Sequence, residues 1–321
     1  MKAVTLLALA AVAAISSVPP AIAQQFPVKP IRIVVPFTPG GPNDVLARMV
    51  GQRLTELWGQ QVIVDNRPGG GTVIGSDFVA KAPADGHTLL VTSTSTAVNP
   101  SINRKLPYDT LKDFAPVIRM VASPNVLVAH PALPVKNVAD LIRLAKSKPG
   151  EIAYASGGTG AATHLAGELV CIMGGVRMTH VPYKGAGPAT VDLISGQVQW
   201  MFGTIMPTLP HIKTGRLRAI GVTGDKPTAV LPDVPPVSAT LKGFDATSWY
   251  GIFAPAQTPR AVVAKLNEEI GRYFRLPETR ASLAKDGTVT VADTPEEFDR
   301  FFRSEVAKWA KVIKQAGIEV Q

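Results

Sequence analysis

The stretch that decides the fold is IRIVVPFTPGGPND, residues 31–44. It opens with a short apolar, β-branched run closed by proline, which is typical of a buried strand. The two glycines that follow predict a tight turn. The spacing of one helix face then recurs in Leu46, Val50, Leu54 and Leu57. The stretch therefore predicts a strand, a glycine-rich loop and a helix whose apolar face covers a sheet.

The same order of strand, loop and helix recurs along the chain, and each loop is rich in glycine or hydroxyl groups. Further strand-and-loop pairs are residues 61–66 with 67–71, 88–91 with 92–96, 152–155 with 156–160, and 178–183 with 184–188. Alternating β and α elements indicate an α/β fold in which helices flank parallel or mixed sheets.

Two extended stretches, residues 116–128 and 247–254, are predicted to cross between two lobes. This division places residues 24–122 together with 249–321 in lobe 1, and residues 123–248 in lobe 2. Each lobe is then a mixed sheet flanked by helices, and the two crossing strands join them. Such a clamshell has its cleft at the domain junction, where ligand sites preferentially lie.

Residues 1–23 have the features of a secretory signal peptide. Lys2 supplies a basic n-region, and residues 3–15 are apolar apart from one threonine. Residues 16–20 break any helix, and the triplet that ends at Ala23 is an A-x-A cleavage signal. The apolar run is shorter than the roughly 20 residues that span a bilayer. We therefore expect a periplasmic protein cleaved after Ala23, with an uncleaved signal anchor as the alternative.

Composition excludes several classes of protein. Loss of Lys2 with the leader lowers the formal net charge from +9 to about +8, and the basic residues are scattered. With 6% aromatic residues and no basic stripe, the chain lacks the pattern of a nucleic-acid-binding protein. A diffuse positive field instead raises the encounter rate with small anions. The single cysteine, Cys171, excludes an intrachain disulfide and is expected to be a small buried apolar residue.

Two loops, one in each predicted lobe, offer the same anion-binding device. Residues 37–44 and 156–160 both lie between the end of a strand and the start of a helix, where open α/β sheets bind ligands. Glycine lets backbone N–H groups approach an anion, and the helix N-terminus adds unsatisfied donors. One terminus contributes about 0.3–1 kcal/mol, whereas micromolar affinity requires about 8 kcal/mol. We therefore expect the loops to act as a pair; for either loop alone, a tight turn without a ligand is the alternative.

The predicted ligand-binding residues come mainly from these loops. In lobe 1 they are Phe37, Thr38, Pro39, Gly40, Gly41, Asn43, Asp44, Thr92, Ser93 and Thr94. In lobe 2 they are Ser156, Gly157, Gly158, Thr159, Gly160, His164, Tyr183, Lys184 and Thr204. His164 is placed either to donate to a bound carboxylate or to cap its own loop. Tyr183 and Lys184 lie at another strand end, from which each side chain can reach the cleft or solvent.

Motifs for other chemistry fail in detail. Residues 158–163 begin like the dinucleotide-binding G-x-G-x-x-G but end in threonine, and residues 70–76 have Walker-like spacing without its lysine. Without a G-x-S-x-G elbow, a hydrolase would have to use Ser156, His164 and Asp192. The five histidines show no i, i+4 pairing that would support zinc. We therefore expect neither an enzyme nor a metal site.

A series of short motifs spans the mature chain: PIRIVVPF (30–37), PGG with Asp44 (39–44), VDNRPG (64–69), LPYD (106–109), YASG with Gly160 (154–160), HLAGE (164–168), VPYKG (181–185) and LPDVP (231–235). In these motifs the chain resembles the substrate-binding receptors of tripartite tricarboxylate transporters, also called Bug receptors. The resemblance implies a two-lobe periplasmic-binding-protein fold, a Venus flytrap of type II-like form, that binds carboxylates without a cofactor. It implies that a ligand carboxylate is held between residues 37–44 and 156–160, partly through water.

The resemblance also implies a receptor that delivers its ligand to membrane permease subunits, and we expect it to be a monomer. A receptor that serves a signalling partner and a secreted hydrolase are the alternatives. The chain departs from the family at Gly203-Thr204, where members often carry an acidic or amide residue, and in the dense hydroxyl run of residues 92–96. We therefore expect the far end of the ligand to be recognised differently. Dicarboxylates, acidic amino acids, tricarboxylates and aromatic acids are all candidate ligands.

Overall fold

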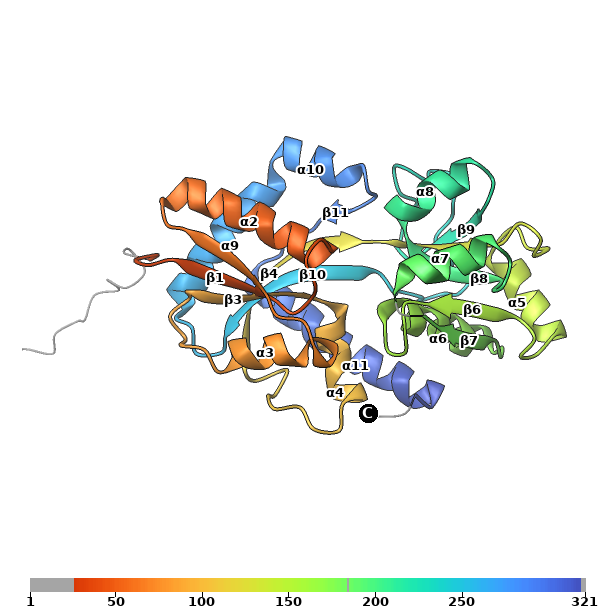
Figure 1. Cartoon of the computed structure of the whole chain (residues 1–321), viewed down its shortest axis with the longest axis horizontal. Helices are drawn as coiled ribbons and strands as arrows, with labels where there is room; N and C mark the ends of the chain where they lie inside the picture. Colours follow the sequence, from red (N-terminus) through yellow and green to blue (C-terminus); the bar gives the residue numbers. More distant parts are fainter. Residues whose placement is uncertain (1–25, 184, 319–321) are drawn as a thin grey trace, which may run out of the picture.

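Two lobes lie side by side in the computed structural model, which describes residues 26–183 and 185–318 (Figure 1). The predicted leader and Lys184 lie outside the described residues. Two strands, β4 (Phe114–Ser123) and β10 (Ser248–Pro255), run from the first lobe toward the second. The predicted two-lobe α/β fold with crossing strands is confirmed.

The first lobe is built on a six-stranded mixed sheet with the order β11-β4-β10-β3-β1-β2. Strand β1 pairs in parallel with β2 and β3, whereas β10 pairs antiparallel with β3 and β4. Its other strands are β1 (Ile31–Val35), β2 (Val62–Asn66), β3 (Thr88–Ser93) and β11 (Val289–Thr290). Its helices are α2 (Pro42–Trp58), the 3-10 turn η1 (Gly70–Thr72), α3 (Val73–Ala80), α4 (Thr94–Ile102), α9 (Arg260–Arg275), α10 (Pro277–Ala284) and α11 (Pro295–Ala316).

The second lobe is built on a five-stranded mixed sheet with the order β7-β6-β8-β5-β9. Its strands are β5 (Asn125–Ala129), β6 (Ala153–Ser156), β7 (Thr179–Pro182), β8 (Trp200–Thr204) and β9 (Arg218–Val222). Its helices are α5 (Val138–Ser147), α6 (Ala162–Gly174), α7 (Ala186–Ile194), α8 (Ile205–Lys213) and the 3-10 turn η2 (Val237–Ala239). Within the described part of the chain, no helix has the length and apolar character needed to cross a membrane.

The crossing between the lobes is held by side-chain hydrogen bonds. Strand β4 ends at Ser123 and β5 begins at Asn125, so the stretch predicted as one crossing strand serves two sheets. The Asn125 amide donates to the Ser248 hydroxyl over 3.1 Å, which joins the two crossing segments. The Thr247 hydroxyl donates to the Thr223 carbonyl over 3.1 Å. These bonds tie both crossing segments to each other and to β9 where the lobes meet.

Two local expectations are wrong. The hydroxyl-rich run predicted as a loop is instead the end of β3 joined directly to α4. The Thr92 and Thr96 hydroxyl oxygens lie 2.6 Å apart and are fully buried, so they satisfy each other and the junction needs no loop. Leu57, predicted on the buried face of α2, is 38% exposed because it lies in the last turn of that helix.

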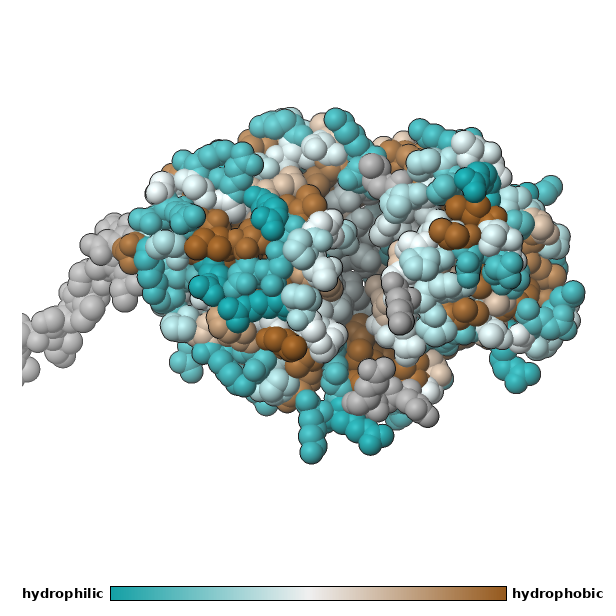
Figure 2. Space-filling view, viewed as in Figure 1, coloured by the Kyte–Doolittle hydropathy of each residue, from teal (hydrophilic) through white to brown (hydrophobic). Residues whose placement is uncertain are grey.

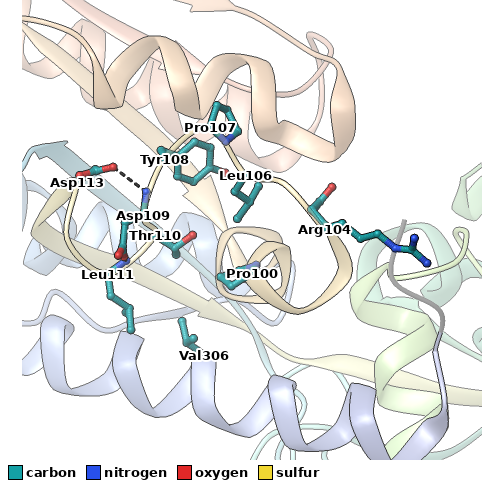
Figure 3. A pocket seen from close by; sticks show the side chains of 11 residues that line it. Pro100, Arg104, Leu106, Pro107, Tyr108, Asp109, Thr110, Leu111, Asp113 and Val306 are labelled. Carbon is teal, nitrogen blue, oxygen red and sulfur yellow. Dashed lines mark hydrogen bonds between the residues drawn. The ribbon is translucent and has the colours of Figure 1, made fainter.

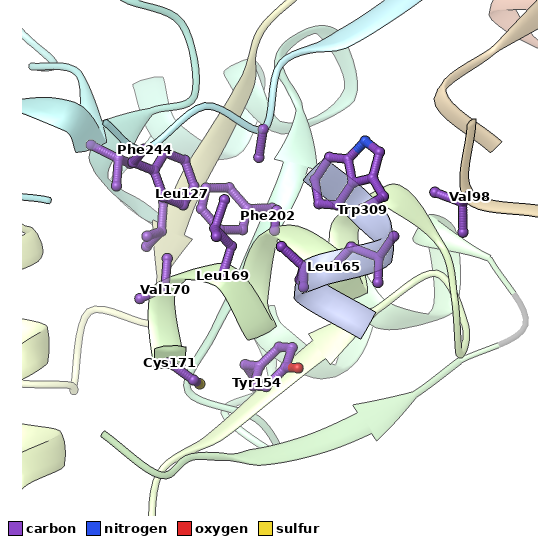
Figure 4. Packing of buried hydrophobic residues seen from close by; sticks show 14 of the residues in the cluster. Val98, Leu127, Tyr154, Leu165, Leu169, Val170, Cys171, Phe202, Phe244 and Trp309 are labelled. Atoms are coloured by element: carbon purple, nitrogen blue, oxygen red, sulfur yellow. The ribbon is translucent and has the colours of Figure 1, made fainter. Parts of the chain in front are cut away.

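Helix α11 packs on both lobes, whereas the sequence division assigns it to lobe 1. In its first half the Phe298 ring lies 4.8 Å from the Phe253 ring of β10. In its second half Trp309 lies beside Leu165 of α6, within one buried cluster (Figure 4). The helix therefore joins the hinge strands to the second lobe.

Glu305 of α11 is a buried carboxylate that links this helix to the hinge. It is 2% exposed, and its Oε2 accepts hydrogen bonds from the indole N–H groups of Trp249 and Trp309, each over 3.0 Å. Lys308 forms an ion pair with its other oxygen. Because every one of these partners compensates for desolvation, the buried charge fixes the position of α11 on β10.

We predict that Trp309→Ala lowers the free energy of unfolding by about 3–5 kcal/mol, since it leaves a cavity between the lobes and removes a donor from Glu305. Denaturant unfolding of the mature protein measures the change. Lys311→Ala, at an exposed position on the same helix, is the control and should stay within about 0.5 kcal/mol. A loss below about 1 kcal/mol in Trp309→Ala would show that α11 contributes little to holding the lobes.

Candidate ligand-binding site

The two predicted loops face each other across a cavity between the lobes. The cavity has a volume of about 410 Å³ and is lined by Phe37 and Thr38 from lobe 1 and by residues 157–161 from lobe 2. Figure 2 shows the groove that separates the two lobes. Strand ends β1 and β6 place these loops, as expected for ligand sites in open α/β sheets.

Three helix N-termini converge on this cavity. Its lining includes Thr72, the N-cap of α3, Ser95 in the first turn of α4, and Ala161, the N-cap of α6. None of the three helices has a side-chain cap, in contrast to α5 and α11, which are capped by Asn137 and Thr294. A helix begins with N–H groups that have no intrahelical acceptor. Helices α4 and α6 therefore present unsatisfied donors and positive dipole ends to one space.

The described residues that line this cavity carry no charged side chain. Their polar groups are hydroxyls, one amide and backbone, so no carboxylate opposes the entry of an anion. Neutral donors and helix dipoles suffice for anion binding at helix N-termini. The electrostatics of the cavity therefore favour a small anion.

Asp44, a predicted ligand residue, instead holds the first loop from beneath. Its Oδ2 accepts the Gly40 N–H over 2.9 Å and the Arg48 Nε–H over 3.0 Å, and its Oδ1 accepts the Asn66 amide over 3.0 Å. The Arg48 hydrogen bond is the main cause that lowers the pKa of Asp44, which is 3% exposed. Gly40 has a φ of +86°, a left-handed conformation that glycine adopts without strain.

His164 performs the same task in the second loop. Its Nδ1 accepts the Gly160 N–H over 3.0 Å, which answers the question left open by the sequence: His164 caps its own loop. The acceptor nitrogen carries no proton, so the neutral ring has its proton on Nε2, which lies 3.6 Å from Glu168 Oε1. Burial opposes ionisation of Glu168, but hydrogen bonds from His164 and Tyr154 leave its pKa below the ordinary value.

The residues considered for a hydrolase do not assemble. Ser156 is fully buried, and its Oγ lies 2.6 Å from Nε2 of His180 rather than beside His164. The His180 ring stacks on the His164 ring with centroids 3.8 Å apart. Asp192 accepts a hydrogen bond from the Tyr183 hydroxyl over 2.7 Å. The serine and the aspartate thus belong to different clusters, since β6 and α7 carry them to different places.

The remaining predicted residues occupy several environments. Tyr183 packs against the core of lobe 2. Thr92 and Thr94 are buried, at 0% and 3% exposure. Thr204 and Gly40 line a second cavity between the lobes. The structure therefore brings the two loop segments together, while the threonines of β3 and α4 support them from inside the fold.

Sequence reasoning missed one wall of the cavity. Residues 68–72 and the α4 residues Val98, Asn99 and Ile102 also line it. A signal was present in RPGGG, residues 67–71, which is a glycine-rich turn of the same type as the two loops selected. This stretch was considered only as a Walker motif, which it does not match, and its role as a glycine-rich turn beside the cavity was therefore overlooked. The contribution of α4 was hidden because residues 92–96 were predicted as a loop rather than as a helix start.

A larger cavity lies elsewhere in lobe 1. It has a volume of about 630 Å³ and is formed by residues 103–113 with Pro100 and Val306. Figure 3 shows Leu106 and Tyr108 on the loop, with Val306 of α11 on the opposite side. It includes none of the predicted ligand residues, and its charged lining residues are Arg104, Asp109 and Asp113, two acids and one base.

Comparison with known proteins decides the family. Residues 46–318 match the sequence model of the tripartite tricarboxylate transporter family receptor. The chain belongs to this receptor family. BugT of Bordetella pertussis is 36% identical over 305 residues, which cover 94% of both chains. The resemblance to Bug receptors that the sequence motifs indicated is thereby confirmed.

Two solved structures of similar proteins contain carboxylates. Rpa4515 of R. palustris with adipate is 35% identical, with a TM-score of 0.79 over 92% of this chain and 99% of that one. MatC (Rpa3494) from Rhodopseudomonas palustris with bound malate is 31% identical, with a TM-score of 0.75 over 90% of this chain and 100% of that one. The receptor family thus shares the two-lobe fold described above.

The histidine pair predicts a pH dependence of stability. Burial lowers the pKa of His180 to about 4 from 6.5. Between these values the unfolded chain binds the extra proton, so stability is lost as the pH falls from about 6.5 toward 4. His180→Asn can still donate to Ser156 but cannot bind the proton. We predict that the decrease in the free energy of unfolding between pH 6.5 and 4 is smaller in this variant by on the order of 1–3 kcal/mol.

Urea unfolding at a series of pH values from 7 to 4 measures this dependence. His211→Asn, on α8 outside the cluster, is the control and should keep the slope of the unchanged protein. An identical slope in His180→Asn would contradict the assignment of this loss to His180.

Proposed function

We propose that this protein is a periplasmic solute-binding receptor that captures a small carboxylate between its lobes and delivers it to a tripartite tricarboxylate-type membrane transporter. The observation that carries the proposal is the convergence of the uncapped N-termini of α4 and α6, one from each lobe, on one inter-lobe cavity whose described lining residues carry no charge. A carboxylate matches such a site in size and charge. The relatives solved with adipate and with malate support this ligand class.

Binding is proposed to use the two loops as half-sites. Residues 37–38 and the start of α4 line the cavity from lobe 1, and residues 157–161 at the start of α6 line it from lobe 2. A carboxylate therefore contacts donors of both lobes only when the lobes are close. Moving an equilibrium from 1:99 to 99:1 in favour of the closed state requires about a 10⁴-fold preference of the ligand for that state. Two half-sites that meet on closure provide a physical origin for this preference.

The loops are built to avoid reorganisation when the ligand arrives. Asp44 holds the Gly40 amide and His164 holds the Gly160 amide through side-chain hydrogen bonds. A loop that is already in its binding conformation costs less entropy on association. Asp44 and His164 are therefore proposed to act as positioning residues beneath the site.

We further propose export with cleavage after Ala23, action as a monomer with transient binding to the permease subunits, and no catalytic activity. The leader sequence supports export. The proposal of no catalytic activity is supported by the state of two possible nucleophiles, Ser156 and Cys171. Ser156 is fully buried, and burial raises the pKa of the Cys171 thiol to about 12.

Thermal unfolding of the mature protein against small acids and their uncharged amides tests the proposal. An acid at 100 times its Kd should add about 2.7 kcal/mol of stability, and its amide should add none. The protein is first unfolded and refolded to remove carried-over ligand. Equal effects of acids and amides, or no effect of any acid, would contradict carboxylate capture.

A loop variant locates the site. Gly158 has a φ of +131°, and a Cβ there would lie 3.2 Å from the Tyr183 carbonyl oxygen. We predict that Gly158→Ala distorts the second loop and weakens acid binding at least tenfold in a calorimetric titration. Gly150→Ala is the matched control, because Gly150 also has a positive φ, +83°, but lies outside the cavity. Equal affinities in the two variants would argue against this loop as the binding element.

A further inference from the structure

A second cavity between the lobes adjoins the first loop. It has a volume of about 250 Å³ and is lined by Gly40 and Pro42 of that loop and of α2, and by Thr204 and Ile205 from lobe 2. The neighbouring loop residues Phe37 and Thr38 line the anion-binding cavity. One loop therefore borders both spaces.

The walls of the second cavity are mainly apolar and come from both lobes. Val45 and Met49 of α2 and Leu283 of α10 face it from lobe 1, and Ile205 and Pro207 of α8 face it from lobe 2. Val45 is 49% exposed, which is unusual for a valine on a helix whose other apolar residues are mostly buried. Ile205 is buried, whereas Val45 and Pro207 are exposed on opposite sides of the cavity. Exposed apolar side chains gain stability when an apolar group fills the space between them.

The described side chains that line this cavity include no basic partner for a second anion. The Thr288 hydroxyl donates to the Ser123 hydroxyl over 3.2 Å. Burial raises the pKa of Tyr250 to about 12, so this phenol stays neutral. Among the described lining residues the single charged side chain is Asp286, an acid. A ligand with a carboxylate at both ends would bring its second charge toward Asp286 without a basic partner.

The volume sets the size of the group that fits. A cavity of about 150 Å³ binds benzene in a well-characterised protein interior. The 250 Å³ available here therefore holds one aromatic ring or a chain of several methylenes.

We propose that this second cavity binds the uncharged hydrocarbon end of the ligand, so that the receptor selects monocarboxylates with an aliphatic chain or a single ring over dicarboxylates. The inference rests on the proposed carboxylate capture and adds the chemistry of the far end. Thr204 lines this cavity at the position where related receptors often have an acidic or amide side chain, so that its wall lacks such a group here.

Calorimetric titration of the refolded mature protein with acetate, butyrate, hexanoate, benzoate and adipate tests the inference. Each added methylene should tighten Kd by about fourfold until the cavity is filled. Hexanoate and adipate have the same carbon count and differ in the second carboxylate, and hexanoate should bind at least tenfold more tightly. Tighter binding of adipate, or affinities that do not depend on chain length, would overturn the inference while leaving carboxylate capture intact. No binding of any acid, together with no binding of the amides, would instead overturn the proposed function.

A variant reverses the predicted selectivity. Val45→Lys places a positive charge in the cavity, so it should weaken hexanoate at least tenfold and tighten adipate at least threefold. Leu57→Lys introduces the same charge on the same helix, at an exposed position outside the cavity, and should keep the affinities of the unchanged protein. Thermal unfolding of both variants verifies that they fold. An unchanged ratio of hexanoate to adipate affinity in folded Val45→Lys would overturn the placement of the hydrocarbon end.

Discussion

The site depends on one interaction that occurs once in each lobe: a glycine amide is held by the side chain four residues later. Asp44 accepts the Gly40 N–H, and His164 accepts the Gly160 N–H. Each bond ties a glycine-rich turn to the first turn of the helix behind it. The two lobes thus present loops of fixed shape to one cleft, although one lobe uses a carboxylate and the other a neutral imidazole.

This arrangement explains how an anion can bind where none of the described lining residues is basic. The glycine amides that shape the turns are already occupied, so the donors left for a ligand are those of the uncapped helix starts. Each contributes little by itself, and several must converge. Convergence requires both lobes, which makes closure and binding a single event. The buried Glu305 ties α11 to the hinge strand β10, and the same helix packs on α6 of the second lobe.

The sequence predicted the fold and the two loops because their signals are local. Residues 31–44 specify strand, turn and helix through β-branched residues, glycines and a helical stripe, and the family motifs follow the same order. The wall formed by residues 68–72 and α4 could not be predicted in this way, since it depends on how α3 and α4 pack on the sheet of the first lobe and on α11. The role of His164 also needed coordinates, because a histidine one turn into a helix can face the ligand or its own loop. His180 was assigned no role, since its contact with Ser156 crosses two strands that are 24 residues apart in sequence.

The most direct test of the central claim is a titration of backbone amide chemical shifts with an acid that binds. The first-turn amides of α4 and α6, residues 94–96 and 162–164, should move downfield together and saturate at one affinity. The first turns of the capped helices α5 and α11 should not move. Saturating shifts confined to residues 103–113, around the larger cavity of lobe 1, would contradict capture of the carboxylate between the lobes.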